Sequence, residues 1–407
     1  MHTPRIRIQN FGPIRDSGWI DIKKVTLFLG NQGSGKSTVA KLISTFLWME
    51  KALYRGDYST KQFERKGMFR SQRLEYHRIE NYLASQSAIE FKGEIYDFSY
   101  SKGDLSISES NSSQGANYRL PQIVYIPAER NFISYIKSSK ELKLSSDSFN
   151  AFIDDYSVTK SSMNGGVELP INESMLEYDK LNDRMKIKGP GYGPIFLSEA
   201  ASGFQSVAPL FLVSRHFSQM RESGNDKSGD MSSDERARFK KQIEEIYDNA
   251  DLTEEQRNVA ISVLSKKFKR KAFINIVEEP EQNLFPSSQS ALLYELLKFN
   301  APEPNKLIVT THSPYIVGAL SLAMKAAEVK AQITGRADLT DRLNEVVQLD
   351  AIVPAQNVAI YEMDEKEGST APLSLEYGVP SDENYLNDLL GQLDSDFDKL
   401  LDIEDEM

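Results

Sequence analysis

One segment, Gly30–Ser37, constrains this chain more than any other. It reads GNQGSGKS, which fits the pattern G-x-x-x-x-G-K-[ST] of a phosphate-binding loop. The apolar run Val25–Leu29 precedes it and helical spacing over 38–54 follows it, so the segment is predicted to join a buried strand to a helix. In that setting the glycines allow backbone N–H groups to surround a phosphate at the positive end of the helix.

The side chains of this loop predict a nucleotide triphosphate site. Lys36 is expected to reach the β- and γ-phosphates, and Ser37 to offer its hydroxyl to Mg²⁺. The loop thus implies a nucleoside triphosphate and Mg²⁺ as ligands, and the resemblance described below implies that the nucleotide is ATP. The other residues predicted to contact the nucleotide from this segment are Asn31, Gln32, Gly33, Ser34, Gly35 and Thr38.

A second apolar strand ends in two carboxylates. Ile274–Val277 runs directly into Glu278 and Glu279, and open α/β sheets bind ligands at the carboxyl ends of their strands. Glu278 is predicted to hold the water shell of Mg²⁺. Glu279 is predicted to be the catalytic residue that polarises the attacking water.

A third apolar strand, Leu307–Thr311, is followed by His312, which is predicted to be catalytic and to hydrogen-bond the γ-phosphate. Its position beside the two carboxylates favours this role over a purely structural one. Between the loop and the acids lies Ser202-Gly203-Phe204-Gln205, a polar turn that runs into helical spacing at 203–221. Taken alone, such a turn is an ordinary helix start.

The order of strands and helices predicts an α/β fold with a mixed central sheet. Alternating segments at 5–9, 20–23, 88–100 and 104–108 predict an antiparallel side sheet, and 60–84 has helical spacing. Helical insertions are expected at 131–200 and 215–270. The predicted domains are 1–130 (N-terminal ATPase lobe), 131–270 (helical insertions), 271–380 (C-terminal ATPase lobe) and 381–407 (acidic helix and tail).

Composition excludes several classes of protein. Hydrophobic residues make up 40% and charged residues 26% of the 407 residues, as in globular proteins. The chain contains no cysteine, which excludes disulfides, zinc–thiolate sites, iron–sulfur clusters and a cysteine nucleophile, and fits a cytoplasmic location. No segment has the length of a membrane span or the apolar core of a signal peptide, so a soluble protein that makes no membrane contact is expected.

Most of the net charge of −11 lies at the C-terminus. Residues 382–407 carry −9, which leaves −2 for the rest of the chain and argues against a strongly basic nucleic-acid binder. Apolar positions recur at helical spacing through 382–401, which predicts an amphipathic helix followed by a frayed end at 402–407. This helix either packs on its own domain with its acids in water or docks a basic partner.

These motifs together resemble the ABC-type ATPase heads. In chain order they are the phosphate-binding loop, the signature-like turn 202–205, the strand with its acids at 274–279, a D-loop at 280–286 and the switch histidine at 312. More narrowly, Asn10–Ile14, Tyr125–Arg130, Glu278–Glu281 and Thr311–Pro314 are similar to the soluble AAA-15/AAA-21 branch. That branch includes the heads of OLD nucleases and the ATPase subunits of anti-phage systems such as PARIS and Septu.

The resemblance implies a head-to-tail homodimer, or a higher homo-oligomer built on dimers, with ATP between one protomer's loop and the other's signature turn. Ser202, Gly203 and Gln205 would then touch the γ-phosphate in the partner's site. Phe204 stands where many relatives have a second glycine. The glutamine of a Q-loop is not identifiable, and Glu129 and Arg130 are predicted either to couple ATP to the inserted lobe or to form an ordinary surface ion pair.

The sequence argues against two kinds of nuclease centre. Asp394-Ser395-Asp396 would suit a Toprim site only at the end of an apolar strand, whereas helical spacing precedes it. Arg70 and His77 have the loose spacing of a HEPN ribonuclease, but Ser71 stands where Asn, Asp or His usually follows the arginine, and the pair stands alone on a charged helix. Nucleolysis, if it belongs to this system, is therefore expected on another chain.

The resulting hypothesis is an ATPase that acts as an ATP-gated sensor and scaffold in bacterial anti-phage defence and controls a separate effector protein. The rival is a RecF-like DNA-repair ATPase that binds DNA directly, so nucleic acid stays a possible partner. A third alternative, an ATP-binding structural protein without turnover, is disfavoured by the presence of Glu279.

Overall fold

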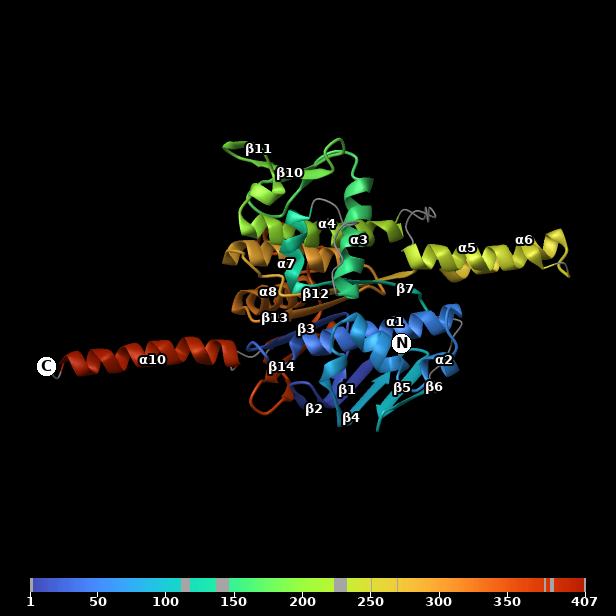
Figure 1. Ribbon diagram of the computed structural model, residues 1–407. Coiled ribbons are helices and arrows are strands. Elements are labelled where there is room, and N and C mark those ends of the chain that lie inside the picture. Colours follow the sequence, from blue (N-terminus) through green and yellow to red (C-terminus); the bar gives the residue numbers. More distant parts are fainter. Residues whose placement is uncertain are drawn as a thin grey trace.

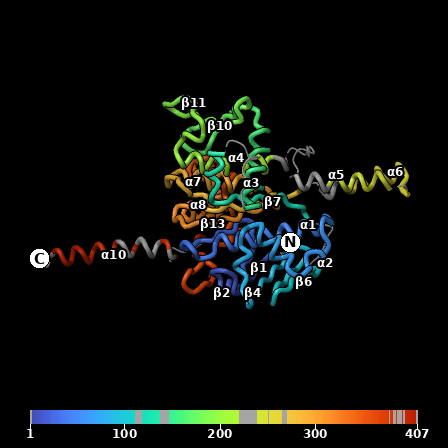
Figure 2. Tube along the Cα trace, in the orientation of Figure 1, coloured from blue at the N-terminus to red at the C-terminus, as the bar shows by residue number. Residues whose placement is uncertain are grey.

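A computed structural model describes residues 3–110, 118–136, 146–222, 233–249, 251–268, 270–376, 378–380 and 384–405. Figure 1 shows a layered body from which two helical projections extend in opposite directions. One is the pair α5 (Ser233–Asp248) and α6 (Glu254–Phe268), and the other is α10 (Tyr385–Asp405). Figure 2 shows both projections along the Cα trace. None of the described helices combines the length and apolar character that a bilayer span requires.

Eleven of the described strands form one mixed sheet. In its parallel half, β7, β12, β13, β3 and β14 lie side by side in that order, and β15 pairs antiparallel with β14. The bounds of these strands are β7 (Pro121–Ile126), β12 (Ala272–Glu278), β13 (Lys306–Thr311), β3 (Val25–Gly30), β14 (Val358–Asp364) and β15 (Ser369–Pro372). Its antiparallel half contains β2 (Ile14–Asp21), β1 (Arg5–Phe11), β4 (Leu83–Lys92), β5 (Tyr96–Ser101) and β6 (Asp104–Glu109).

The parallel half is buried on both faces, which explains the unbroken apolar runs in its strands. Successive residues of β3 point into two different cores: Leu27 and Leu29 into one, Phe28 into the other. The first core contains residues of α4 (Ser202–Glu222), α7 (Pro286–Asn300) and α8 (Pro314–Gln332). The second contains the buried face of α1 (Lys36–Arg55). Figure 1 shows these helices on opposite sides of the sheet.

The prediction of a helical insertion at 131–200 is wrong for its second half. After α3 (Asp147–Ser162), a separate antiparallel sheet contains β8 (Val167–Glu168), β9 (Met175–Asp179), β10 (Arg184–Gly189) and β11 (Tyr192–Phe196). In β10, Met185 and Ile187 are buried, whereas Lys186 and Lys188 pair with acids of β9 at 2.7 and 2.5 Å. This alternation with period two is the signal of a half-buried strand.

Two smaller expectations also fail. The helical spacing at 60–84 yields only α2 (Thr60–Phe63), one π-helical turn at Phe69–Leu74 and a 3-10 turn at Glu80–Tyr82. At the C-terminus, α10 continues through Asp405, beyond the predicted helix end. The remaining elements are α9 (Ala337–Val346), β16 (Leu375–Glu376), β17 (Val379–Pro380) and short 3-10 helices at Ala128–Tyr135, Leu197–Glu199 and Ala355–Asn357.

Candidate active site

The phosphate-binding loop joins β3 to α1, as its sequence context predicts, and its backbone requires glycine. Gly33 and Gly35 have φ angles of 80° and 100°, in the left-handed region that other residues rarely adopt. Gly35 also lies against the turn between β1 and β2, since a Cβ added there would come within 2.9 Å of Cγ1 of Ile14. The turn at Asn10–Ile14 is therefore packed directly against the phosphate-binding loop.

The polar groups of the loop form a cradle for an anion. Lys36 is buried, and its Nζ donates to the carbonyl oxygens of Gly30 and Asn31 at 2.8 and 2.7 Å. Burial lowers the pKa of Lys36, and nearby acids, first among them Glu279, oppose that shift. The buried Ser34 hydroxyl has no hydrogen-bond partner within the described chain, so it is free to donate to a phosphate oxygen.

The other predicted loop residues have differing exposures. Asn31, Gln32 and Gly33 are exposed, and Asn31 Nδ2 donates to Glu365 Oε1 at 3.2 Å, which ties the loop to the turn after β14. Ser37 is half-buried and Thr38 is buried at the first turn of α1. All six residues from Asn31 to Lys36, together with Ser37 and Thr38, thus lie where β3 meets the N-terminus of a helix.

Glu278 is a buried carboxylate held in a fixed orientation. The Tyr125 hydroxyl donates to its Oε1, and the backbone N–H of Ala128 donates to its Oε2 at 3.3 Å. Burial raises the pKa of Glu278, while Lys41, Tyr125 and a hydrogen bond with Ser37 act in the opposite direction. A hydroxyl and a carboxylate oxygen next to a phosphate cradle are the donors that Mg²⁺ prefers, so these residues fit the metal.

Glu279 stands at a sharp turn directly after β12. Its φ of 43° is in the left-handed region, which costs backbone strain in a residue other than glycine. The turn is fixed because its N–H donates to the Thr310 carbonyl at 2.9 Å. The Glu279 side chain is 28% exposed, and its Oε1 lies 3.9 Å from Nδ1 of His312. A carboxylate that is reachable from solvent yet fixed by its backbone suits the activation of a water molecule.

His312 is held by a carboxylate that the sequence reasoning missed. Oε1 of Glu281 accepts from the Thr311 hydroxyl at 2.7 Å and from the His312 backbone N–H at 2.8 Å, and it lies 3.3 Å from His312 Nδ1. Glu281 is buried, and burial raises its pKa. The signal in the sequence is the third acid of the run Glu278–Glu281, two residues beyond Glu279.

The signature turn stands at the start of α4, beside the D-loop (residues 280–286). Ser202 is exposed. Gly203 must be glycine, because a Cβ there would come within 2.8 Å of the Asn283 carbonyl oxygen. Gln205 is buried, and its Nε2 donates to the carbonyls of Ala200 and Ser198 at 2.9 and 3.3 Å. Its amide is thus engaged within its own turn, and its predicted contact with a partner's nucleotide stays a prediction.

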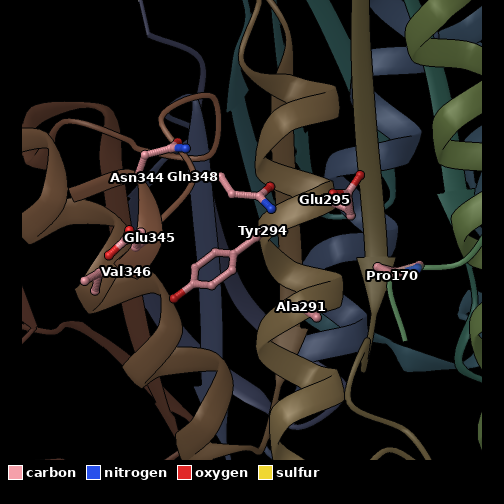
Figure 3. A pocket seen from close by; sticks show the side chains of 8 residues that line it. All are labelled: Pro170, Ala291, Tyr294, Glu295, Asn344, Glu345, Val346 and Gln348. Carbon is pink, nitrogen blue, oxygen red and sulfur yellow. The ribbon is translucent and has the colours of Figure 1, made fainter. Parts of the chain in front are cut away.

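Parallel strand pairing brings most of the predicted site together. The phosphate-binding loop follows β3, His312 follows β13, and Glu278 and Glu279 end β12, and these three strands are adjacent. Another pocket lies elsewhere, between α7, the end of α9 and the segment around Pro170 (Figure 3). It shares no residue with the predicted nucleotide site. Its lining consists of Pro170, Ala291, Tyr294, Glu295, Asn344, Glu345, Val346 and Gln348.

Comparison with known proteins agrees with this geometry. The family model AAA_15, described as AAA ATPase domain, matches residues 1–317. No curated protein matches the chain. The predicted fold class, an α/β P-loop NTPase with a mixed central sheet, is confirmed.

Many solved structures are similar to the chain at low identity, among them the following three. The SMC head domain from Thermotoga maritima has 14% identity and a TM-score of 0.36, over 92% of this chain and 100% of that one. The recombination mediator protein RecF of the RecFOR pathway has 12% identity and a TM-score of 0.31, over 91% and 99%. A nucleotide-free ATP-binding cassette from an ABC transporter has 13% identity and a TM-score of 0.29, over 93% of each chain.

The contacts of Glu281 predict that it acts through His312. In Glu281→Gln the Oε1 acceptor remains but the negative charge beside the imidazole is lost, so kcat for ATP hydrolysis is expected to fall by on the order of 10-fold. The KM for ATP should change little, because Glu281 has no role in binding the phosphates. Steady-state kinetics with thermal melting of each variant provide the measurement.

A double-mutant cycle supplies the control. In a His312→Ala background, adding Glu281→Gln should cause little further loss of kcat. An equal loss in both backgrounds would show that Glu281 works independently of His312.

Proposed function

The chain belongs to the AAA_15 family of ATPase domains and is an ATP hydrolase, and from this premise we propose that it hydrolyses ATP with Mg²⁺ at the interface of a head-to-tail homodimer. The observation that carries the proposal is the placement of Lys36, Glu279 and His312 around one sheet edge, next to a buried and fixed Glu278. Phosphate binding, metal support and water activation are thus available from one protomer.

Each residue of that edge has a separable role. Lys36 binds the β- and γ-phosphates while loop N–H groups and Ser34 hold their oxygens. Ser37 and Glu278 would hold Mg²⁺, which would neutralise charge on the phosphates. Glu279 orients and polarises the attacking water, and His312, held by Glu281, hydrogen-bonds the γ-phosphate. These groups are positioned before the nucleotide arrives, which is the basis of electrostatic catalysis.

The second half of each site comes from the partner protomer. Ser202 is exposed at the start of α4, and Gly203 is shaped to fit against the D-loop. Head-to-tail pairing presents this turn to the ATP of the other protomer. Gln205 joins this contact only if its bonds to Ala200 and Ser198 are exchanged for the nucleotide.

In the cell we assign the protein to anti-phage defence, as an ATP-gated sensor and scaffold for a separate nuclease or toxin. The surroundings of both nuclease-like residue sets argue against nucleolysis: His77 is 2% exposed, and Asp394 and Asp396 lie on the exposed helix α10. A separate effector needs a docking surface. α10 packs on the body through Leu386 near its start and then extends away from it in Figure 1, so packing on its own domain does not account for the apolar positions of its outer part.

The surface of α10 combines acids with exposed apolar side chains. Phe397 and Leu400 are each 62% exposed and Ile403 is 58% exposed. The acids Asp394, Asp396, Asp398 and Asp402 are exposed on the same helix. This combination suits a basic effector with an apolar groove, because charge speeds the encounter and apolar burial stabilises the complex.

Turnover gives the first test of the proposed function. Glu279→Gln should keep ATP affinity and trap the dimer while lowering hydrolysis by about 10²–10⁴-fold, because the residue acts on water. Lys36→Ala should lose ATP binding, and Lys330→Ala, an exposed lysine at the end of α8, is the control. Isothermal titration and light scattering measure binding and dimerisation. Equal ATP affinity in Glu279→Gln and Lys36→Ala would refute the assignment.

The same preparations separate defence from DNA repair. A scaffold should show ATPase activity that duplex DNA changes little. A RecF-like repair ATPase should show strong stimulation by DNA that decreases steeply as salt is raised, because phosphate contacts release counterions.

Mixing two inactive variants tests the shared site. Ser202→Arg spoils the signature turn, and Lys36→Ala spoils the phosphate-binding loop, so neither homodimer has a working site. In the mixed dimer one interface combines an intact loop with an intact turn, and a 1:1 mixture should recover about a quarter of wild-type activity. Absence of recovery on mixing would exclude head-to-tail pairing.

Neutralising the acids of α10 tests the docking surface. Replacing Asp394, Asp396, Asp398 and Asp402 by Asn should weaken copurification with the coexpressed product of the neighbouring gene at low salt, without altering ATPase activity. The matched control replaces four exposed acids on other helices, Glu254, Glu255, Asp338 and Asp341, by the corresponding amides. Unchanged copurification in the α10 variant would place the effector elsewhere.

A further inference from the structure

Arg130 is a fully buried guanidinium that bonds to four main-chain carbonyls. Its Nη1 donates to the oxygens of Glu278 and Pro127 at 2.7 and 3.2 Å, and its Nη2 donates to that of Glu279 at 2.6 Å. Its Nε donates to the Ser206 carbonyl of α4 at 3.0 Å. Burial lowers the pKa of Arg130 to about 10, so the group still carries its charge at neutral pH.

The fork of Arg130 therefore joins two parts of the site. Its Nη1 and Nη2 atoms bond to the backbone carbonyls of Glu278 and Glu279, the second of which is in the left-handed turn. Its Nε atom bonds to the Ser206 carbonyl of α4, one turn after Gly203. Since a guanidinium is planar, movement of one set of carbonyls must tilt the whole fork or break its bonds.

Ser206 continues the chain of contacts to the D-loop. It is 0% exposed, and its hydroxyl accepts a hydrogen bond from Nδ2 of Asn283 at 3.0 Å. The Asn283 backbone in turn touches Gly203, as the close approach of its carbonyl oxygen shows. The signature turn is thus fixed from two directions, by Arg130 through Ser206 and by the D-loop itself.

We propose that Arg130 is a positioning residue that ties a protomer's signature turn to the backbone of its own catalytic acids and so acts on the ATP site of the partner. This relay runs from the Glu279 backbone through Arg130 to Ser206. Because that turn completes the site of the partner, the two ATP sites of a dimer become interdependent. The proposal rests on the head-to-tail dimer proposed above, and it gives that dimer a route for regulation between its sites.

The mixed dimer separates this relay from a purely local role. The working site takes its loop from the Ser202→Arg protomer and its signature turn from the Lys36→Ala protomer. Adding Arg130→Lys only to the Lys36→Ala protomer leaves the acids of the working site with an intact Arg130. The relay predicts that kcat of the working site still falls, by about 5-fold or more, with the KM for ATP nearly unchanged.

A second variant keeps the test decisive if Arg130→Lys does not fold. Asn283 is exposed and has a φ of 61°, so Asn283→Gly removes the amide without adding backbone strain. In the Lys36→Ala protomer it should lower kcat in the same direction. Asn172→Gly, at a φ of 53° before β9, is the matched control and should have no effect.

The outcomes distinguish the two proposals. In one outcome, activity recovers on mixing and then stays unchanged when Arg130→Lys is added to the Lys36→Ala protomer. That result would overturn the relay and leave the dimer standing. If Arg130→Lys is unfolded, the same result with Asn283→Gly has the same meaning. Loss of activity only when Arg130→Lys is placed in the Ser202→Arg protomer would assign Arg130 a local role and also overturn the relay. No recovery even with wild-type Arg130 would overturn the dimer, and the relay with it.

Discussion

The parallel pairing of β3, β13 and β12 aligns three strand ends, and the loop, the acids and the histidine of the proposed ATP site are each attached to one of them. Leu29 lies opposite Thr311, and Thr310 lies opposite Glu278. A change of register by one residue would reverse the direction of every side chain along a strand. The distance between the phosphate-binding loop and the carboxylates is therefore set by backbone hydrogen bonds deep in the sheet, and long surface insertions can be added without changing it.

The site concentrates buried charge and stabilises it with fixed dipoles. Burial raises the pKa of both Glu278 and Glu281 and lowers that of Lys36. Backbone N–H groups and hydroxyls donate to the two carboxylates, and the opposite charges of lysine and acids offset part of the desolvation. Such a site is prepared for a ligand that brings both negative phosphates and a divalent cation.

The helical insertion α5–α6 is connected directly to two elements that carry residues of the proposed site. The projecting pair α5 and α6 lies in the chain between α4, which carries the signature turn, and β12, which carries the acids. The D-loop connects β12 to α7 and touches the signature turn through Asn283. Catalytic, signature and projecting segments are thus neighbours in the fold, whereas α10 leaves the body on the opposite side (Figure 1).

Local pattern by itself determined the strand–loop–helix of the phosphate site, the acids after β12, His312 and the amphipathic α10, because each depends on residues close in sequence. Only the tertiary structure revealed the sheet β8–β11, because its strands are short and a clear period-two alternation is confined to β10. It also decided that Glu281 orients His312 and that Arg130 bridges two elements. The Arg130 bonds to Glu279 and Ser206 span 149 and 76 residues. No spacing rule encodes such bonds, since they exist only once the sheet has brought its strand ends together.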